Sequence, residues 1–158
     1  MEPTDLVKTV DDLKYPVITV SRPGYIDVQE SPESLTTGYA RRVRKRWYEG
    51  MTIVDRDLER YSVVEARIVG GVGPFWGYSL MYSRRVRLIF DLESRGLAAL
   101  DELRELVCRA MKRDPHLWES TLHEDGVRGW KAKVRQCGDV AELHALLRPG
   151  MALGAASR

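Results

Sequence analysis

The side chains most suited to chemistry in this sequence are two short clusters of carboxylates. Asp55, Asp57 and Glu59 alternate along the chain, and so do Asp91 and Glu93. Two carboxylates on one face of a strand can act as a general acid and a general base, or they can bind Mg²⁺. The first cluster also joins two predicted strands, where Asp is favoured because it accepts local hydrogen bonds. We expect a structural turn there, and a small enzyme using Asp55, Asp57, Asp91 or Glu93 stays open as a minor alternative.

Histidine, cysteine and glycine patterns predict no further reactive centre. His116 and His123 are seven residues apart, whereas a zinc-binding helix places two histidines four apart. Cys108 and Cys137 form no CxxC motif, and Gly-x-Ser-x-Gly is absent. The glycines between Gly70 and Gly77 do not lead into a helix N-terminus, which a phosphate loop requires. We therefore expect no catalytic residue, no metal and no cofactor, and a buried, inert thiol at Cys108.

Two surfaces are candidate binding sites, and the first is an aromatic pair. Phe75 and Trp76 lie in a glycine-flanked segment, and exposed aromatic side chains are common anchors of protein interfaces. The alternative is that both rings fold back over the edge of the sheet. The sequence leaves these two interpretations open.

The second candidate is a run of basic residues, Arg41, Arg42, Arg44, Lys45 and Arg46. On a helix whose apolar stripe is Tyr39, Val43 and Trp47, these side chains cover the remaining face. One interpretation is a solvated surface. The other is a site for an anion or an acidic partner, because guanidinium groups pair well with carboxylates and phosphates. Further basic residues would extend it if their strand lies nearby, namely Arg84, Arg85 and Arg87.

Composition and charge narrow the class of protein. The chain has 158 residues, 44% of them hydrophobic and 30% charged, which is typical of a globular domain. No apolar run is long enough to span a membrane, and the N-terminus lacks a signal-peptide pattern. A net charge of +2 does not indicate a protein dedicated to binding nucleic acid. Two cysteines without a signal favour reduced thiols and a cytoplasmic location.

The hydrophobic patterns predict one α+β domain over residues 1–150, followed by a flexible tail at 151–158. Runs rich in β-forming residues at 15–20, 25–28, 51–54, 60–69 and 78–93 predict an antiparallel sheet of about five strands. Segments 31–49 and 97–113 predict two main helices, packed on one face of the sheet. Thr36, Thr37 and Gly38 are weak helix formers, so a separate first turn stays open for the earlier helix.

Finer patterns predict which side chains face the core. Val64, Ala66 and Ile68 are expected on one face of their strand, opposite Tyr61. Val86, Leu88, Phe90 and Leu92 share a face of a later strand. Alternation over 130–134 allows another strand, and a last helix is expected to end near Leu147.

The order of these elements resembles that of small α+β immunity proteins of bacterial polymorphic-toxin systems. The resemblance covers residues 30–113 and rests on three features: a helix opened by Ser31-Pro32-Glu33-Ser34-Leu35, a hairpin from Glu49-Gly50-Met51-Thr52-Ile53-Val54-Asp55 to Arg60-Tyr61-Ser62-Val63, and a strand leading into the helix at 97–113. It implies a non-enzymatic cytoplasmic protein that binds and blocks a cognate toxin. Many such proteins are acidic, whereas this chain is nearly neutral, which puts a nuclease target in doubt.

We therefore expect a protein-binding module that acts without turnover, with a toxin domain as its partner. Its candidate contact residues are Phe75, Trp76, Arg41, Arg42, Arg44, Lys45 and Arg46. The alternative is a nucleic-acid-binding or regulatory protein that uses the Arg41–Arg46 face. No association with a membrane is expected, and the sequence does not define an oligomeric state.

Overall fold

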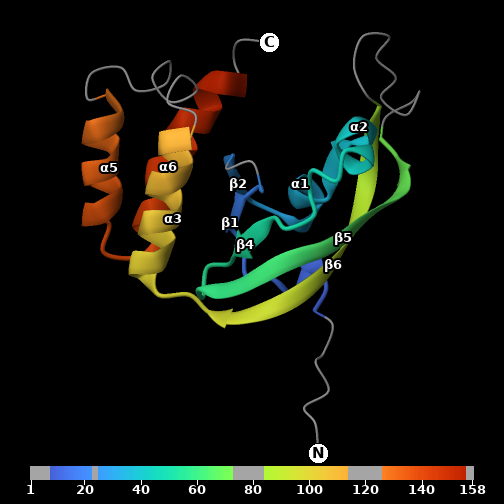
Figure 1. Cartoon of the computed structure of the whole chain (residues 1–158), viewed down its shortest axis with the longest axis horizontal. Coiled ribbons are helices and arrows are strands. Elements are labelled where there is room, and N and C mark those ends of the chain that lie inside the picture. Colours follow the sequence, from blue (N-terminus) through green and yellow to red (C-terminus); the bar gives the residue numbers. More distant parts are fainter. Residues whose placement is uncertain (1–7, 23–24, 73–83, 114–125, 156–158) are drawn as a thin grey trace, which may run out of the picture.

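Six strands pair into one antiparallel sheet (Figure 1). The computed structural model describes residues 8–22, 25–72, 84–113 and 126–155. The strands are β1 (Val17–Val20), β2 (Ile26–Gln29), β3 (Thr37–Tyr39), β4 (Thr52–Val54), β5 (Glu59–Gly71) and β6 (Arg85–Leu97). Their order across the sheet is β2-β1-β4-β5-β6-β3. The predicted α+β class is confirmed, with six strands where about five were expected.

The helices are α1 (Pro32–Leu35), α2 (Ala40–Arg44), α3 (Leu100–Arg113), α5 (Gly126–Gln136) and α6 (Val140–Ala155), and a 3-10 turn, η1, spans Val10–Asp12. One helix was expected over 31–49, but β3 divides it, because residues 37–39 pair with residues 85–87 of β6. These ladder hydrogen bonds prevail over the helical spacing of the apolar residues. The predicted helix at 97–113 begins only at Leu100, because β6 continues to Leu97.

Two expectations near the C-terminus were wrong. Residues 130–134 belong to α5, where Val127, Trp130 and Val134 contact the core at helical spacing. A pattern of alternating residues was therefore mistaken for a strand in a short segment. The last helix, α6, also continues past Leu147 and Pro149 to Ala155.

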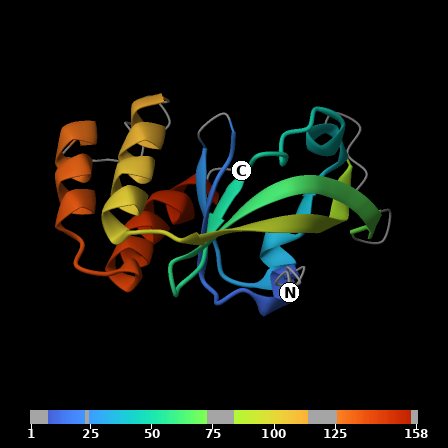
Figure 2. The ribbon, with the colours of Figure 1, turned by 60° about the horizontal axis from the view of Figure 1, so that its bottom comes forward.

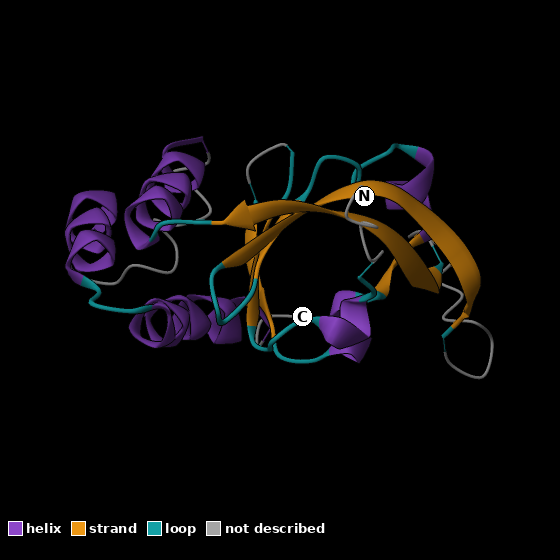
Figure 3. Ribbon diagram, turned by 90° about the horizontal axis from the view of Figure 1, so that it is seen from below, coloured by secondary structure: helices purple, strands orange, loops and turns teal. Residues whose placement is uncertain are grey.

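The long hairpin of β5 and β6 curls into an open arch (Figure 3). As predicted, Val86, Leu88, Phe90 and Leu92 are buried on its inner face. In β5 the expected alternation was wrong: Tyr61 and Val63 are buried, whereas Val64 is 56% exposed. The cause is an irregularity in the pairing between Val63 and Glu65, because an extra residue there reverses which face the following side chains take.

The sheet carries a separate core on each face. On β1, the side chain of Val17 joins one core and that of Ile18 joins the other. The core that contains Ile18 is covered by α3, α5 and α6, and the core that contains Val17 is covered by α1 and α2. The two main helical segments therefore lie on opposite faces and not on one, and the β1–β2 hairpin stands between them (Figure 2).

Candidate binding site

The basic run predicted from the sequence forms one short helix and the turn that follows it. Arg41, Arg42 and Arg44 lie in α2, and Lys45 closes the helix by donating its backbone N–H to the carbonyl of Arg41 at 3.1 Å. Arg46 takes the left-handed conformation, with φ of 54°. This reversal of the backbone ends the helix. The exposed side chain of Arg46 pairs with Glu49 at 3.4 Å. All five basic side chains are exposed.

Arg42 differs from its neighbours because it lies over two aromatic rings. Its guanidinium carbon is 5.4 Å from the centre of the Tyr39 ring and 5.3 Å from that of Trp47. The backbone N–H of Trp47 also donates to the carbonyl of Arg42 at 2.9 Å, so the turn itself brings this pair together. Stacking of a guanidinium on aromatic faces restricts its freedom while leaving its edge N–H groups available as donors.

The aromatic contacts continue onto the β1–β2 hairpin. The rings of Tyr25 and Trp47 lie 5.2 Å apart at an angle of 36°, and Tyr25 is 43% exposed. We call Tyr25, Tyr39, Arg42 and Trp47 the basic–aromatic surface. Tyr48, which follows directly, is buried and accepts the backbone N–H of Tyr39 on its hydroxyl at 3.3 Å, which fixes α2 against β3.

This surface borders a pocket of about 400 Å³ between the hairpin and α1 and α2. Asp27 contributes the only carboxylate among its described lining residues. Its two oxygens accept the N–H of Val28 at 2.9 Å and the side-chain amide of Gln29 at 2.7 Å. Sequence analysis did not select Tyr25 or Asp27. The available signal was the alternation of Tyr25, Asp27 and Gln29 with two apolar residues along β2.

The pocket also changes the ionisation of Asp27. Desolvation by the surrounding walls raises the pKa of this carboxyl, although the side chain remains accessible to water. The Val28 N–H, the charge of Arg42 and the Gln29 amide oppose that shift. Arg42 and Asp27 therefore give the pocket one charge of each sign.

The structure brings further cations to the same end of the molecule. In the pairing of β3 with β6, Arg85 lies opposite Tyr39 and Arg87 lies opposite Thr37. The carbonyl of Arg84 accepts the N–H of Ala40 at 2.9 Å. These three arginines were expected to extend the basic run only if their strand lies near it. That condition is met, because the start of β6 is bonded to the start of α2. The other predicted contact residues, Phe75 and Trp76, lie outside the described residues.

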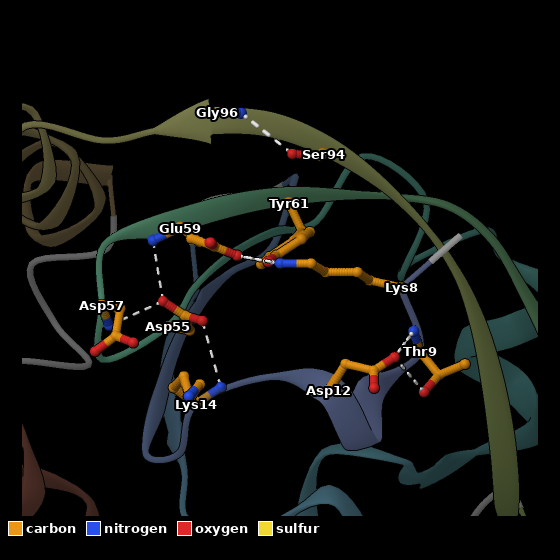
Figure 4. A network of polar contacts seen from close by, with 10 residues as sticks. All are labelled: Lys8, Thr9, Asp12, Lys14, Asp55, Asp57, Glu59, Tyr61, Ser94 and Gly96. Carbon is orange, nitrogen blue, oxygen red and sulfur yellow. Dashed lines mark hydrogen bonds and ion pairs between the residues drawn. The ribbon is translucent and has the colours of Figure 1, made fainter. Parts of the chain in front are cut away.

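The first acidic cluster forms the structural turn that was expected from the sequence (Figure 4). Asp55 is only 1% exposed. Its Oδ1 accepts the backbone N–H groups of Asp57 and Glu59, each at 2.9 Å, and its Oδ2 accepts that of Lys14 at 3.3 Å. These bonds tie the β4–β5 turn to the segment that precedes β1.

The remaining carboxylates of interest also have partners. Glu59 accepts hydrogen bonds from Lys8 and from the Tyr61 hydroxyl, and these bonds lower the pKa of Glu59. Asp91 pairs with Arg67 at 2.7 Å, and Glu93 pairs with Arg95 at 2.8 Å. Each of these three carboxylates therefore has a basic partner, which gives it a structural role on the surface of the sheet.

Histidine and cysteine side chains lie in or near the core that α3 and α6 share. His144 is buried, and burial lowers its pKa; its Nε2 has no hydrogen-bond partner among the residues that the structure describes. Cys108 and Cys137 are buried free thiols, and burial raises the pKa of each. The predicted burial of Cys108 is confirmed. His116 and His123 lie outside the described residues.

Within the described part of the chain, no group of three or more His, Cys, Asp or Glu side chains is placed to hold a metal ion. None of the helices in that part combines the length and the apolar character needed to cross a membrane. Comparison of the chain with protein-family models, curated proteins and solved structures found no significant match.

Proposed function

We propose that this chain is a non-enzymatic, cytoplasmic protein-binding module that uses its basic–aromatic surface to hold an acidic partner. The observation that carries the proposal is the stacking of Arg42 on Tyr39 and Trp47 at the mouth of a pocket. Arginine, tyrosine and tryptophan are the residues that most often dominate the energy of protein interfaces. Here all three types meet on one partly exposed surface.

The partner we propose is a toxin domain that this module binds and neutralises. This assignment rests on the resemblance of residues 30–113 to immunity proteins. A carboxylate of the partner would accept a forked pair of hydrogen bonds from Arg42, and an apolar group would pack against Trp47. The flanking cations Arg41, Arg44 and Lys45 would accelerate encounter with an acidic surface.

The test has two steps: to establish whether a gene beside this one encodes a toxin domain, and to measure binding of the purified chain to that domain. We expect Arg42→Gln to weaken that complex by about tenfold or more, mainly through faster dissociation, because a charge-assisted contact is lost from a stacked site. Arg95→Gln is the matched control, since Arg95 is an exposed arginine whose partner, Glu93, lies on its own strand. Equal affinity of Arg42→Gln and the wild type would remove the surface from consideration.

One observation favours nucleic acid as a second candidate partner. Residues 36–49 and 84–90 together hold eight basic side chains, five and three respectively, and one acidic side chain, Glu49. Such a cluster can neutralise several phosphates, in which case affinity for duplex DNA would fall steeply as salt rises. Fluorescence anisotropy with a labelled duplex at two salt concentrations distinguishes this candidate.

A further inference from the structure

A second pocket lies on the opposite side of the β1–β2 hairpin, facing α3. It has a volume of about 390 Å³, within the range of small-molecule sites. Its described lining residues are Val20, Ser21, Arg22, Gly50, Thr52, Leu106, Arg109, Ala110 and Arg113. Three of these are arginines and none is a carboxylate. We call it the arginine pocket.

Two separate parts of the chain carry the arginines of this pocket. Arg109 and Arg113 are four residues apart on α3, so both side chains leave the same face of that helix. Arg22 lies in the turn that follows β1, and the Nη1 of Arg113 donates to its carbonyl at 3.2 Å. This bond joins the end of α3 to the hairpin.

The stem of the Arg22 side chain passes near Gly50. A Cβ atom added at Gly50 would lie 3.8 Å from the Cδ of Arg22, which is an ordinary van der Waals contact. The reason for a glycine here is its φ of +74°, a conformation that other residues rarely adopt.

No carboxylate is among the described residues that line this pocket, although Glu105 lies four residues before Arg109 on α3 and pairs with Arg135 at 3.3 Å. Arg109 has no ion-pair partner among the described residues. Like charges at positions i and i+4 of a helix repel each other. Basic residues near a helix C-terminus do gain from the helix dipole, which explains part of the preference for Arg109 and Arg113. The dipole does not explain why Arg22 joins them from another element.

The floor and the neutral polar groups of the pocket suit an oxyanion. Val20 and Ala110 are buried beneath it, and an apolar floor strengthens charge–charge attraction. The Oγ of Ser21 accepts the N–H of Tyr25 at 3.0 Å, which leaves its own O–H to donate. Thr52 adds a second hydroxyl to the lining. Guanidinium groups and hydroxyl donors together form the donor set that binds phosphate.

We infer that the arginine pocket binds the phosphate group of a small phosphate ester. A neighbouring pocket of about 660 Å³ shares Thr52, Leu106 and Arg109 with it, and offers space for the organic part. Its lining includes three carboxylates, Asp101, Glu102 and Glu105, which accept hydrogen bonds from amino or hydroxyl groups. The inference does not depend on the proposed toxin partner, whose surface lies across the hairpin.

Isothermal titration of the full chain at low ionic strength tests this inference. The probes are inorganic phosphate, O-phosphoethanolamine and succinate, each against a chloride blank of equal ionic strength. We expect saturable binding of both phosphate compounds and none of succinate. The double variant Arg22→Gln/Arg109→Gln should lose about tenfold or more in affinity for both, because charge-assisted hydrogen bonds are removed.

Lys112→Gln is the matched control. Lys112 lies on the same last turn of α3 as Arg113 and carries the same charge, but it does not line the pocket. Its affinity for phosphate should stay within about twofold of the wild type, as expected when no direct contact is removed. The inference is overturned if neither phosphate compound binds, if succinate binds as tightly, or if Lys112→Gln weakens binding as much as the double variant.

Discussion

At the scale of single residues, Gly38 shows how closely β3 approaches the core. A Cβ atom at this position would lie 2.1 Å from the hydroxyl of buried Tyr48 and 2.9 Å from a methyl group of Leu88. Gly38→Ala should therefore lower the free energy of unfolding by about 1–3 kcal/mol, the usual cost of overpacking a core. Denaturant unfolding followed by circular dichroism measures this change.

Gly70→Ala is the control for that substitution. Gly70 also lies in a strand, but nothing stands within 4 Å of an added Cβ. Its stability should change by less than about 0.5 kcal/mol, as for most surface substitutions. Adding Tyr48→Phe to Gly38→Ala removes the closest clashing atom and should restore part of the loss. If Gly38→Ala unfolds like the wild type, β3 is not packed as closely as described.

At the scale of elements, α3 is held to the sheet by an apolar face. Leu103 is 1% exposed and lies in the core that also contains Ile18 and Val54. Leu103→Ala should cost about 2–5 kcal/mol in unfolding free energy, because a buried cavity replaces the side chain. The same change at Leu97, which is 73% exposed, should cost less than about 0.5 kcal/mol. Similar losses for both variants would contradict the packing of α3.

At the scale of the whole molecule, one sheet connects the two cores. Neighbouring residues of the same strand serve opposite faces: Val17 and Ile18 in β1, and Ile53 and Val54 in β4. Loss of either core would therefore remove the support of the strands that the other core needs. We expect one cooperative transition on heating, with equal calorimetric and van't Hoff enthalpies.

Variants of the two cores sharpen that expectation. Leu103→Ala acts on one core and Gly38→Ala on the other, so both should shift the same single transition to lower temperature. Their urea m-values should equal that of the wild type, because the same surface is exposed on unfolding. Two separate transitions, each moved by only one of the variants, would mean that the cores unfold independently.

Local patterns in the sequence were sufficient for much of this molecule. Alternating apolar residues located the inner face of β6, and the spacing of Leu103, Val107 and Met111 located α3. The Asp55 turn was also predictable, because a short acidic side chain between two strands satisfies nearby N–H groups without help from distant residues. In each case the pattern that predicts the element lies within a few neighbouring residues, even where its side chains then contact distant ones.

Only the tertiary structure decided the rest. The pairing of β3 with β6 joins residues about 50 positions apart and turns part of an expected helix into a strand. It also places Arg85 and Arg87 beside α2. Tyr25, Asp27 and Arg42 meet across a pocket, and Arg22 meets Arg109 and Arg113 across another. A local sequence pattern cannot predict these contacts, because they depend on which strands pair and on which face of the sheet each helix covers.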